Sequence, residues 1–154
     1  CAVNTEVKDG KETKYGLVFH VATPKAKDIN GMFRNTQTDF IYLSMDTGKL
    51  LSVWRLFADS TAECIRLHNF DTCNMPIDTW HGGAKLPMDD MFKGCTHLKY
   101  LIIDDVEFKF KLLKDVLADL PKDCRFVVPR NMIPVYTQQE YWKKPLYRLT
   151  GLHN

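Results

Sequence analysis

Hydrophobic and polar positions along the chain repeat one unit three times. Each unit begins with an apolar residue followed by Phe, continues through a polar or small corner, and ends in an alternating apolar run. The three Phe residues are Phe33, Phe57 and Phe92, and the runs are Ile41/Leu43, Ile65/Leu67 and Leu101/Ile103. The first residue of each run comes 8, 8 and 9 residues after its Phe. The alternation predicts a half-buried strand in every unit, and the apolar spacing around each Phe predicts a short helical piece.

The spacing of the units indicates a solenoid. The Phe residues are 24 and 35 residues apart, and the second interval contains a Pro-flanked, Gly-rich insertion at 76–87. Without its twelve residues the interval is 23, and Val116 follows Phe92 by 24 residues, which adds a fourth, modified unit. A period in the twenties with one strand per unit is typical of leucine-rich repeats. We therefore predict an α/β fold, a short leucine-rich-repeat solenoid with a parallel β-sheet and short helical crossovers.

The pattern also predicts where the elements and segments lie. We expect strands at 15–21, 40–43, 63–67, 98–103 and 125–128, with the second, third and fourth adjacent in that order. We expect helical pieces at 26–33, 50–57, 89–92 and 138–144, with Trp54 on a core-facing side, and the longest helix at 108–120. Residues 1–27 form an N-terminal lead-in and capping strand, 28–129 the solenoid, and 130–154 a C-terminal capping segment.

Strand alternation identifies the candidate binding residues. If the apolar runs point inward, Tyr42, Arg66 and Ile102 point outward, and Tyr100 shares their face. Tyr and Arg are enriched at interface centres, so this face is the candidate contact surface. Trp80, in the polar insertion, is either pinned back on the scaffold or a further contact anchor. The alternative is that the C-terminal segment, with its aromatic residues Tyr141 and Trp142, folds over the outward face.

Three stretches resemble a known family. Residues 91–101, MFKGCTHLKYL, look like the repeat M-F-x-G-C-x-x-L-x-x-L, residues 70–75, FDTCNM, look like the link F-D-T-S-N-V/M, and residues 120–129 resemble the closing unit of such arrays. The chain thus resembles, over residues 28–129, the BspA-like and mycoplasma-type lipoprotein-repeat branch of leucine-rich-repeat proteins. The resemblance implies a right-handed solenoid, and a surface protein of bacteria, their phages or protists that acts in binding or adhesion.

Charge and hydropathy exclude several classes of partner. The 154 residues carry a net charge of +2, from 21 basic and 19 acidic side chains, which argues against an electrostatic nucleic-acid binder. No apolar run approaches the roughly 20 residues that span a bilayer, so we expect no membrane insertion. Because the chain begins at Cys1, where a mature lipoprotein also begins, a lipid anchor at Cys1 stays open beside a processed or fragment start.

The cysteines do not form a metal or redox motif. The five, at positions 1, 64, 73, 95 and 124, include no C-x-x-C pair, so zinc and thioredoxin-like signatures are absent. We expect Cys64 and Cys95 to be reduced, buried and inert thiols, since free Cys behaves as a small apolar residue.

No catalytic motif is present in the sequence. A nucleophile pair of Cys64 or Cys73 with His68 is conceivable, but His68 is expected near a strand end, where it is more often a surface or binding residue. Asp89–Asp90 precedes a helical turn and Asp104–Asp105 ends a strand, and both are expected to be structural. A calcium site would need further oxygen ligands at suitable spacing, which are not apparent. We therefore predict no metal, no cofactor and no enzymatic activity.

The resulting expectation is a non-catalytic protein-binding module on a cell or virion surface, whose partner is a protein. The alternatives are a structural component of a virion or cell-envelope assembly, whose partner is its own assembly, and a small enzyme. A cytoplasmic location stays open.

Overall fold

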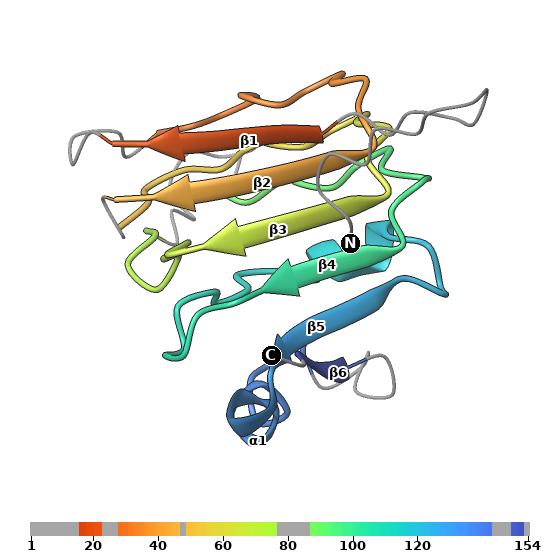
Figure 1. The fold of residues 1–154 in the computed structure, drawn as a ribbon. Helices are drawn as coiled ribbons and strands as arrows, with labels where there is room; N and C mark the ends of the chain where they lie inside the picture. The colour runs from red at the N-terminus through yellow and green to blue at the C-terminus, as the bar shows by residue number, and fades with distance from the viewer. Residues whose placement is uncertain (1–15, 23–27, 47–48, 77–86, 143–148, 153–154) are drawn as a thin grey trace.

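The protein is a parallel solenoid. A computed structural model describes residues 16–22, 28–46, 49–76, 87–142 and 149–152. Their strands are β1 (Gly16–Val21), β2 (Phe40–Met45), β3 (Cys64–His68), β4 (Tyr100–Ile103), β5 (Arg125–Pro129) and β6 (Leu149–Leu152). They form one sheet in chain order, and every neighbouring pair is parallel (Figure 1). The predicted strands, their direction and the order β2–β3–β4 are confirmed, in a coil of about four turns.

Alternation along the strands builds the core. The inward residues of β2, β3 and β4 are the predicted pairs, and all six are fully buried: Ile41, Leu43, Ile65, Leu67, Leu101 and Ile103. Opposite the sheet, Phe57 stacks between Phe33 and Phe92, with ring centroids 5.6 and 5.8 Å apart. Apolar residues therefore line up from coil to coil, which is how a solenoid makes one continuous core from units that cannot fold alone.

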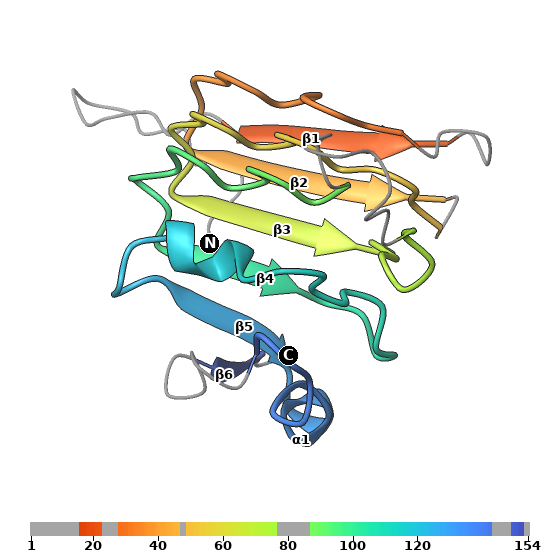
Figure 2. The ribbon, with the colours of Figure 1, turned by 180° about the vertical axis from the view of Figure 1, so that it is seen from behind.

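Around Phe33, Phe57 and Phe92, the side of the coil opposite the sheet consists of turns (Figure 2), so the helical pieces predicted around each Phe are wrong. Two residues before each Phe the backbone has positive φ, at Gly31, Arg55 and Asp90. Two residues after each Phe it does so again, at Asn35, Asp59 and Gly94. A right-handed helix cannot accommodate these left-handed residues.

Hydrogen bonds between coils replace those of a helix. Phe33 N–H donates to the Leu56 carbonyl and Phe57 N–H to the Met91 carbonyl, both at 2.9 Å. The residues between these donors close short turns, such as Leu56 N–H to the Val53 carbonyl at 3.1 Å. Backbone groups must be paired when buried, and here the neighbouring coil pairs them.

The longest predicted helix, at 108–120, is also wrong in its extent. Only Val116–Asp119 is helical, as the 3-10 turn η1, although the apolar residues of the segment are buried or half-buried as expected. The short helices that follow are η2 (Arg130–Met132) and α1 (Ile133–Tyr136), so the expected helix at 138–144 is absent over its described part, 138–142. Trp54, expected in the core, is only half-buried, with the Arg55 guanidinium 4.5 Å from its ring centre.

In the described part of the C-terminal segment, Trp142 packs into the main core and not over the outward sheet face. Trp142 is fully buried and meets Phe110, Phe126 and Tyr136 edge-on, with centroids 6.1, 5.8 and 4.8 Å away. Phe126 is an inward residue of β5, in register with Leu101. Trp142 therefore packs in the main core beyond β5, and this residue does not lie over the outward face. No helix in the described ranges has the length and apolar character needed to cross a membrane.

The cysteines differ in their chemical state. Cys95 is a buried free thiol that donates to the Phe57 carbonyl at 3.0 Å, as predicted. Cys64 is buried, but it is disulfide-bonded, so the expectation of a reduced thiol is wrong. Cys64 sits on the outward parity of β3, where a disulfide can be reached without crossing the core.

Candidate functional site

The strand register places three of the predicted contact residues in one row on the outward face of the sheet, the face toward the viewer in Figure 1. Tyr42 of β2 is opposite Arg66 of β3, which is opposite Ile102 of β4. Tyr100 lies two residues before Ile102 on β4, on the same face, and is 44% exposed. Ile102 is only 6% exposed, so it supports the face from beneath rather than offering an open contact. Trp80 lies outside the described residues.

A small apolar cluster supports this face. Phe40, Cys64 and Ile102 are buried together on the outward side, separate from the main core, and Tyr42 and Val127 pack against them half-buried. The outward face is therefore not a uniformly solvated sheet surface. Around the predicted contact residues, its accessible part consists of Tyr100, the exposed portions of Tyr42 and Arg66, and the exposed Arg125, which is in register with Tyr100.

Arg66 is held from two sides. Its guanidinium lies 5.2 Å from the centre of the Tyr42 ring, and its Nε donates to Asp104 Oδ2 at 2.7 Å. The Tyr42 hydroxyl donates to the same carboxylate oxygen at 3.4 Å. Burial, followed by the negative charge of Asp104, raises the pKa of Tyr42. The three side chains form one polar unit of fixed geometry, because each is held by the other two.

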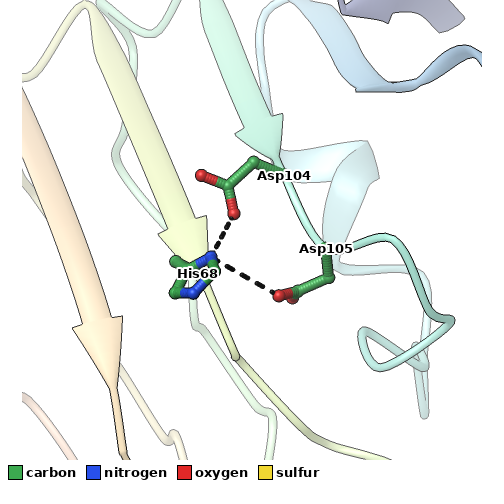
Figure 3. A group of neighbouring side chains, drawn as sticks. All are labelled: His68, Asp104 and Asp105. Carbon is green, nitrogen blue, oxygen red and sulfur yellow. Dashed lines mark hydrogen bonds and ion pairs between the residues drawn. The ribbon is translucent and has the colours of Figure 1, made fainter.

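The carboxyl ends of β3 and β4 bring a histidine and two carboxylates together. Leu67 pairs with Ile103, so His68 at the end of β3 comes opposite Asp104, and Asp105 follows. His68 Nδ1 lies 2.7 Å from Asp104 Oδ1 and 3.7 Å from Asp105 Oδ1 (Figure 3). Side chains that follow neighbouring parallel strands meet at the same sheet edge, and here they do so across 36 residues of sequence.

Asp105 is the buried member of this group. The residue is 5% exposed, and its Oδ1 accepts the Asn69 backbone N–H at 2.7 Å. Its Oδ2 is buried without a hydrogen-bond partner. Burial raises the pKa of Asp105, against the lowering effect of the Asn69 hydrogen bond and of His68. The carboxylate also raises the pKa of the buried Tyr136 hydroxyl, although burial itself raises that pKa more.

A surface pocket of about 380 Å³ opens at this position. His68, Asp104 and Asp105 line it together with Glu107 and Lys109. The Lys109 ammonium donates to the Asn69 side-chain oxygen at 2.6 Å, which fixes the residue whose backbone binds Asp105. The pocket is small, polar and mixed in charge, which suits an ion or a small polar group rather than an apolar ligand.

Two chemistries are available to the group. One ring nitrogen and two carboxylates, with ligand atoms all within 4.8 Å of one another, could hold a metal ion. Without a metal, a protonated His68 would pair with both carboxylates. The conceivable nucleophile pair is not formed, because Cys64 is in a disulfide and the Cys73 thiol donates to the Lys109 carbonyl at 3.4 Å, while His68 Nδ1 faces the two carboxylates.

Comparisons with known proteins found no matching family model, no matching curated protein and no matching solved structure.

Proposed function

We propose that the protein is a non-catalytic protein-binding module that contacts its partner through the outward face of the sheet, around Tyr100 and the Tyr42–Arg66 pair. The observation that carries this proposal is the fixed geometry of Arg66 between the Tyr42 ring and Asp104. Tyr and Arg dominate binding energy at interfaces, and side chains already held in place lose less conformational entropy on binding.

The surrounding apolar cluster supports the same proposal. Phe40, Cys64 and Ile102 hold the backbone of three strands together beneath the exposed side chains. A partner would therefore meet a firm, slightly amphipathic surface. Interface centres commonly have this composition, with charged residues sparse and aromatic residues frequent.

The finer assignment is a leucine-rich-repeat surface protein of the BspA-like type, at a cell or virion surface. The solenoid with one parallel strand per unit supports the repeat class. The disulfide at Cys64 supports an oxidising compartment, since disulfides persist outside the reducing cytosol.

A photo-crosslinking experiment tests the contact face. A photo-reactive amino acid replaces Tyr100 in one variant and Lys93 in a matched control, since Lys93 is exposed on the turn side of the coil. We expect a defined protein adduct from position 100 that excess unlabelled protein competes away, and none from position 93. Equal adducts from both positions, or none from either, would contradict the proposal.

The captured protein, once purified, then provides the quantitative test. Tyr100→Ala and Arg66→Gln should each weaken binding by at least about tenfold, because truncated hot-spot residues typically cost more than about 1.4 kcal/mol. Lys93→Gln should leave the affinity unchanged. Unchanged affinity in the first two variants, with the fold intact by circular dichroism, would place the contact elsewhere.

A second function, as a component of its own assembly, is favoured by β1. Leu17, Val18 and Phe19 of this edge strand are all exposed, Val18 to 62%. An exposed apolar edge strand is a template for pairing with another chain. Sedimentation of the purified protein distinguishes the two functions. Concentration-dependent association that Val18→Lys abolishes would favour assembly, and a monomer at all concentrations would exclude self-association through β1.

A further inference from the structure

The strand-end group has the donor set and the spacing of a metal centre. Ligand atoms about 2.0–2.1 Å from a tetrahedral zinc ion lie roughly 3.3 Å from one another. His68 Nδ1 is 2.7 Å from Asp104 Oδ1 and 3.7 Å from Asp105 Oδ1, values on either side of that separation. The ligand atoms of all three residues lie within 4.8 Å of one another, so side-chain rotations that draw the two carboxylates together would place them around one ion.

Asp105 provides an independent indication of a ligand. Its side chain is 4% exposed and the residue lines the pocket, yet its Oδ2 atom has no hydrogen-bond partner among the described residues. A buried polar atom without a partner is unfavourable and rare in folded proteins, and an unseen ion is one of its standard explanations. Without a bound ligand, burying this unpaired carboxylate oxygen would lower the stability of the fold.

The local charge balance points in the same direction. Arg66 compensates Asp104 directly, at 2.7 Å. Asp105 has no ion pair with a Lys or Arg side chain among the described residues, since its neighbour at 3.7 Å is the His68 ring and the Lys109 ammonium is bonded to Asn69. A bound cation would supply the missing positive charge while leaving the His68 ring neutral, the form in which imidazole binds metals.

Other side chains already orient the ligands. The second oxygen of Asp104 accepts from Arg66 Nε and from the Tyr42 hydroxyl, while Asp105 Oδ1 accepts from the Asn69 backbone. Metal-binding carboxylates are held by such outer hydrogen bonds in most sites, and these bonds tune affinity strongly.

We propose that His68, Asp104 and Asp105 bind a divalent transition-metal ion, with zinc the best match. Imidazole and carboxylate ligands together suit zinc and its first-row neighbours, whereas calcium takes six to eight oxygen ligands. The ion would join the end of β3 to the segment after β4, next to the contact face. Glu107 lines the same pocket, so another carboxylate is present beside the proposed ligands.

Isothermal titration calorimetry on tag-free, metal-stripped protein tests the site with zinc chloride alone. We expect one zinc ion per chain, and at least about a tenfold weaker dissociation constant in His68→Gln and in Asp105→Asn. Calcium chloride under the same conditions should give no saturable binding of comparable affinity. His68→Gln is the primary variant, because the His68 side chain is 48% exposed and its replacement leaves the core intact.

The matched control is His20→Gln. His20 lies in the same row of the sheet, since His20 pairs with Ser44 and Ser44 with His68. It also meets a carboxylate, with Nε2 3.0 Å from Asp46 Oδ1, but this pair is exposed and includes one carboxylate among the described residues. Zinc binding should therefore be unchanged in His20→Gln.

Thermal unfolding separates loss of the site from loss of the fold. Zinc should raise the melting temperature of the wild-type protein and of His20→Gln, but not of His68→Gln, whose own melt without metal should stay cooperative. Absence of zinc binding by the wild-type protein would overturn the proposal. Equal zinc affinity in all variants, or a loss in His20→Gln as large as in His68→Gln, would overturn it as well.

Discussion

At the scale of single residues, the aromatic ladder concentrates much of the packing. Phe57 stacks on Phe33 and Phe92 with interplanar angles of 14° and 9°, and all three rings are buried. Phe19 extends the ladder edge-on from Phe33 but is 46% exposed, because it lies on the first strand. Burial along the ladder therefore decreases toward β1, and the energetic weight of each ring should follow its burial.

We predict that Phe57→Ala and Phe92→Ala each lower the free energy of unfolding by about 3–5 kcal/mol, the usual range for a buried Phe. Phe57→Ala should be the more damaging, because two stacked neighbours lose a partner instead of one. Phe19→Ala, the control, should lower it by less than about 1.5 kcal/mol, since its ring is only partly withdrawn from water. Urea unfolding followed by circular dichroism measures all three. Equal losses would mean that stacking and burial do not set the order.

The cysteines provide a second prediction at this scale. Burial raises the pKa of Cys95 to about 12 and also raises that of the exposed Cys73, to which Asp71 contributes. Since thiolates react and thiols do not, iodoacetamide at pH 8 should modify Cys73 slowly and leave Cys95 and Cys124 unmodified. Peptide mapping by mass spectrometry measures each site. Modification of Cys95 as fast as Cys73 would show that the corner after Phe92 opens readily.

At the scale of elements, the turn side of the three coils that carry Phe33, Phe57 and Phe92 depends on two left-handed residues in each. Two of the six positions are glycines, three are Asn or Asp, and one is Arg: Gly31, Gly94, Asn35, Asp59, Asp90 and Arg55. Gly adopts positive φ without strain, and Asn and Asp tolerate it better than other residues. Arg55 is the costly exception, and its guanidinium packs over the Trp54 ring.

Gly31 and Gly94 form a matched pair for testing the turns. Gly31→Ala adds a methyl group with no heavy atom within 4 Å, so it should cost only the left-handed strain of about 1–2 kcal/mol. Gly94→Ala carries the same strain and drives its methyl group against the Asp59 side chain, with the Asp59 Cα 3.3 Å away. We expect it to destabilise by roughly 1 kcal/mol more, as overpacking typically does. The reverse order in urea unfolding would contradict this account of the turns.

The strands were predictable from the sequence and the turns were not, for related reasons. Alternating apolar residues such as Ile65 and Leu67 specify a strand and its inward face directly. Leu50, Val53 and Phe57 have the spacing of one helical face, and all three are buried. However, Arg55 and Asp59 adopt left-handed conformations, so the backbone that buries them follows turns instead of a helix. Periodicity reports which side chains are buried, and it does not report the backbone between them.

The candidate site was predictable only in pieces. Arg66 and Tyr42 on the outward face followed from strand alternation, and His68 and Asp104–Asp105 were each placed at a strand end. Their meeting depends on the register of β3 against β4, which pairs Leu67 with Ile103 across the insertion at 76–87. No local pattern encodes that register, and a disulfide at Cys64 could not be inferred from an odd number of cysteines.

At the scale of the whole molecule, the two ends of the coil differ. Trp142 and Tyr136 close the end beyond β5, whereas Leu17, Val18 and Phe19 leave the β1 end exposed to solvent among the described residues. Each coil contacts its neighbours, so stability in a solenoid is approximately a sum of units and nearest-neighbour interfaces. Local opening should therefore begin at β1 and spread inward.

Hydrogen exchange measured by mass spectrometry tests this gradient. Backbone amides of β1 should exchange fastest and those of β3 slowest, because β3 has a paired strand and a packed coil on both sides. Trp142→Ala should speed exchange in β5, where Phe126 loses its edge-on partner at 5.8 Å, while leaving β2 unchanged. If Trp142→Ala instead speeds exchange equally in all strands, the solenoid opens as one cooperative unit and its ends do not act independently.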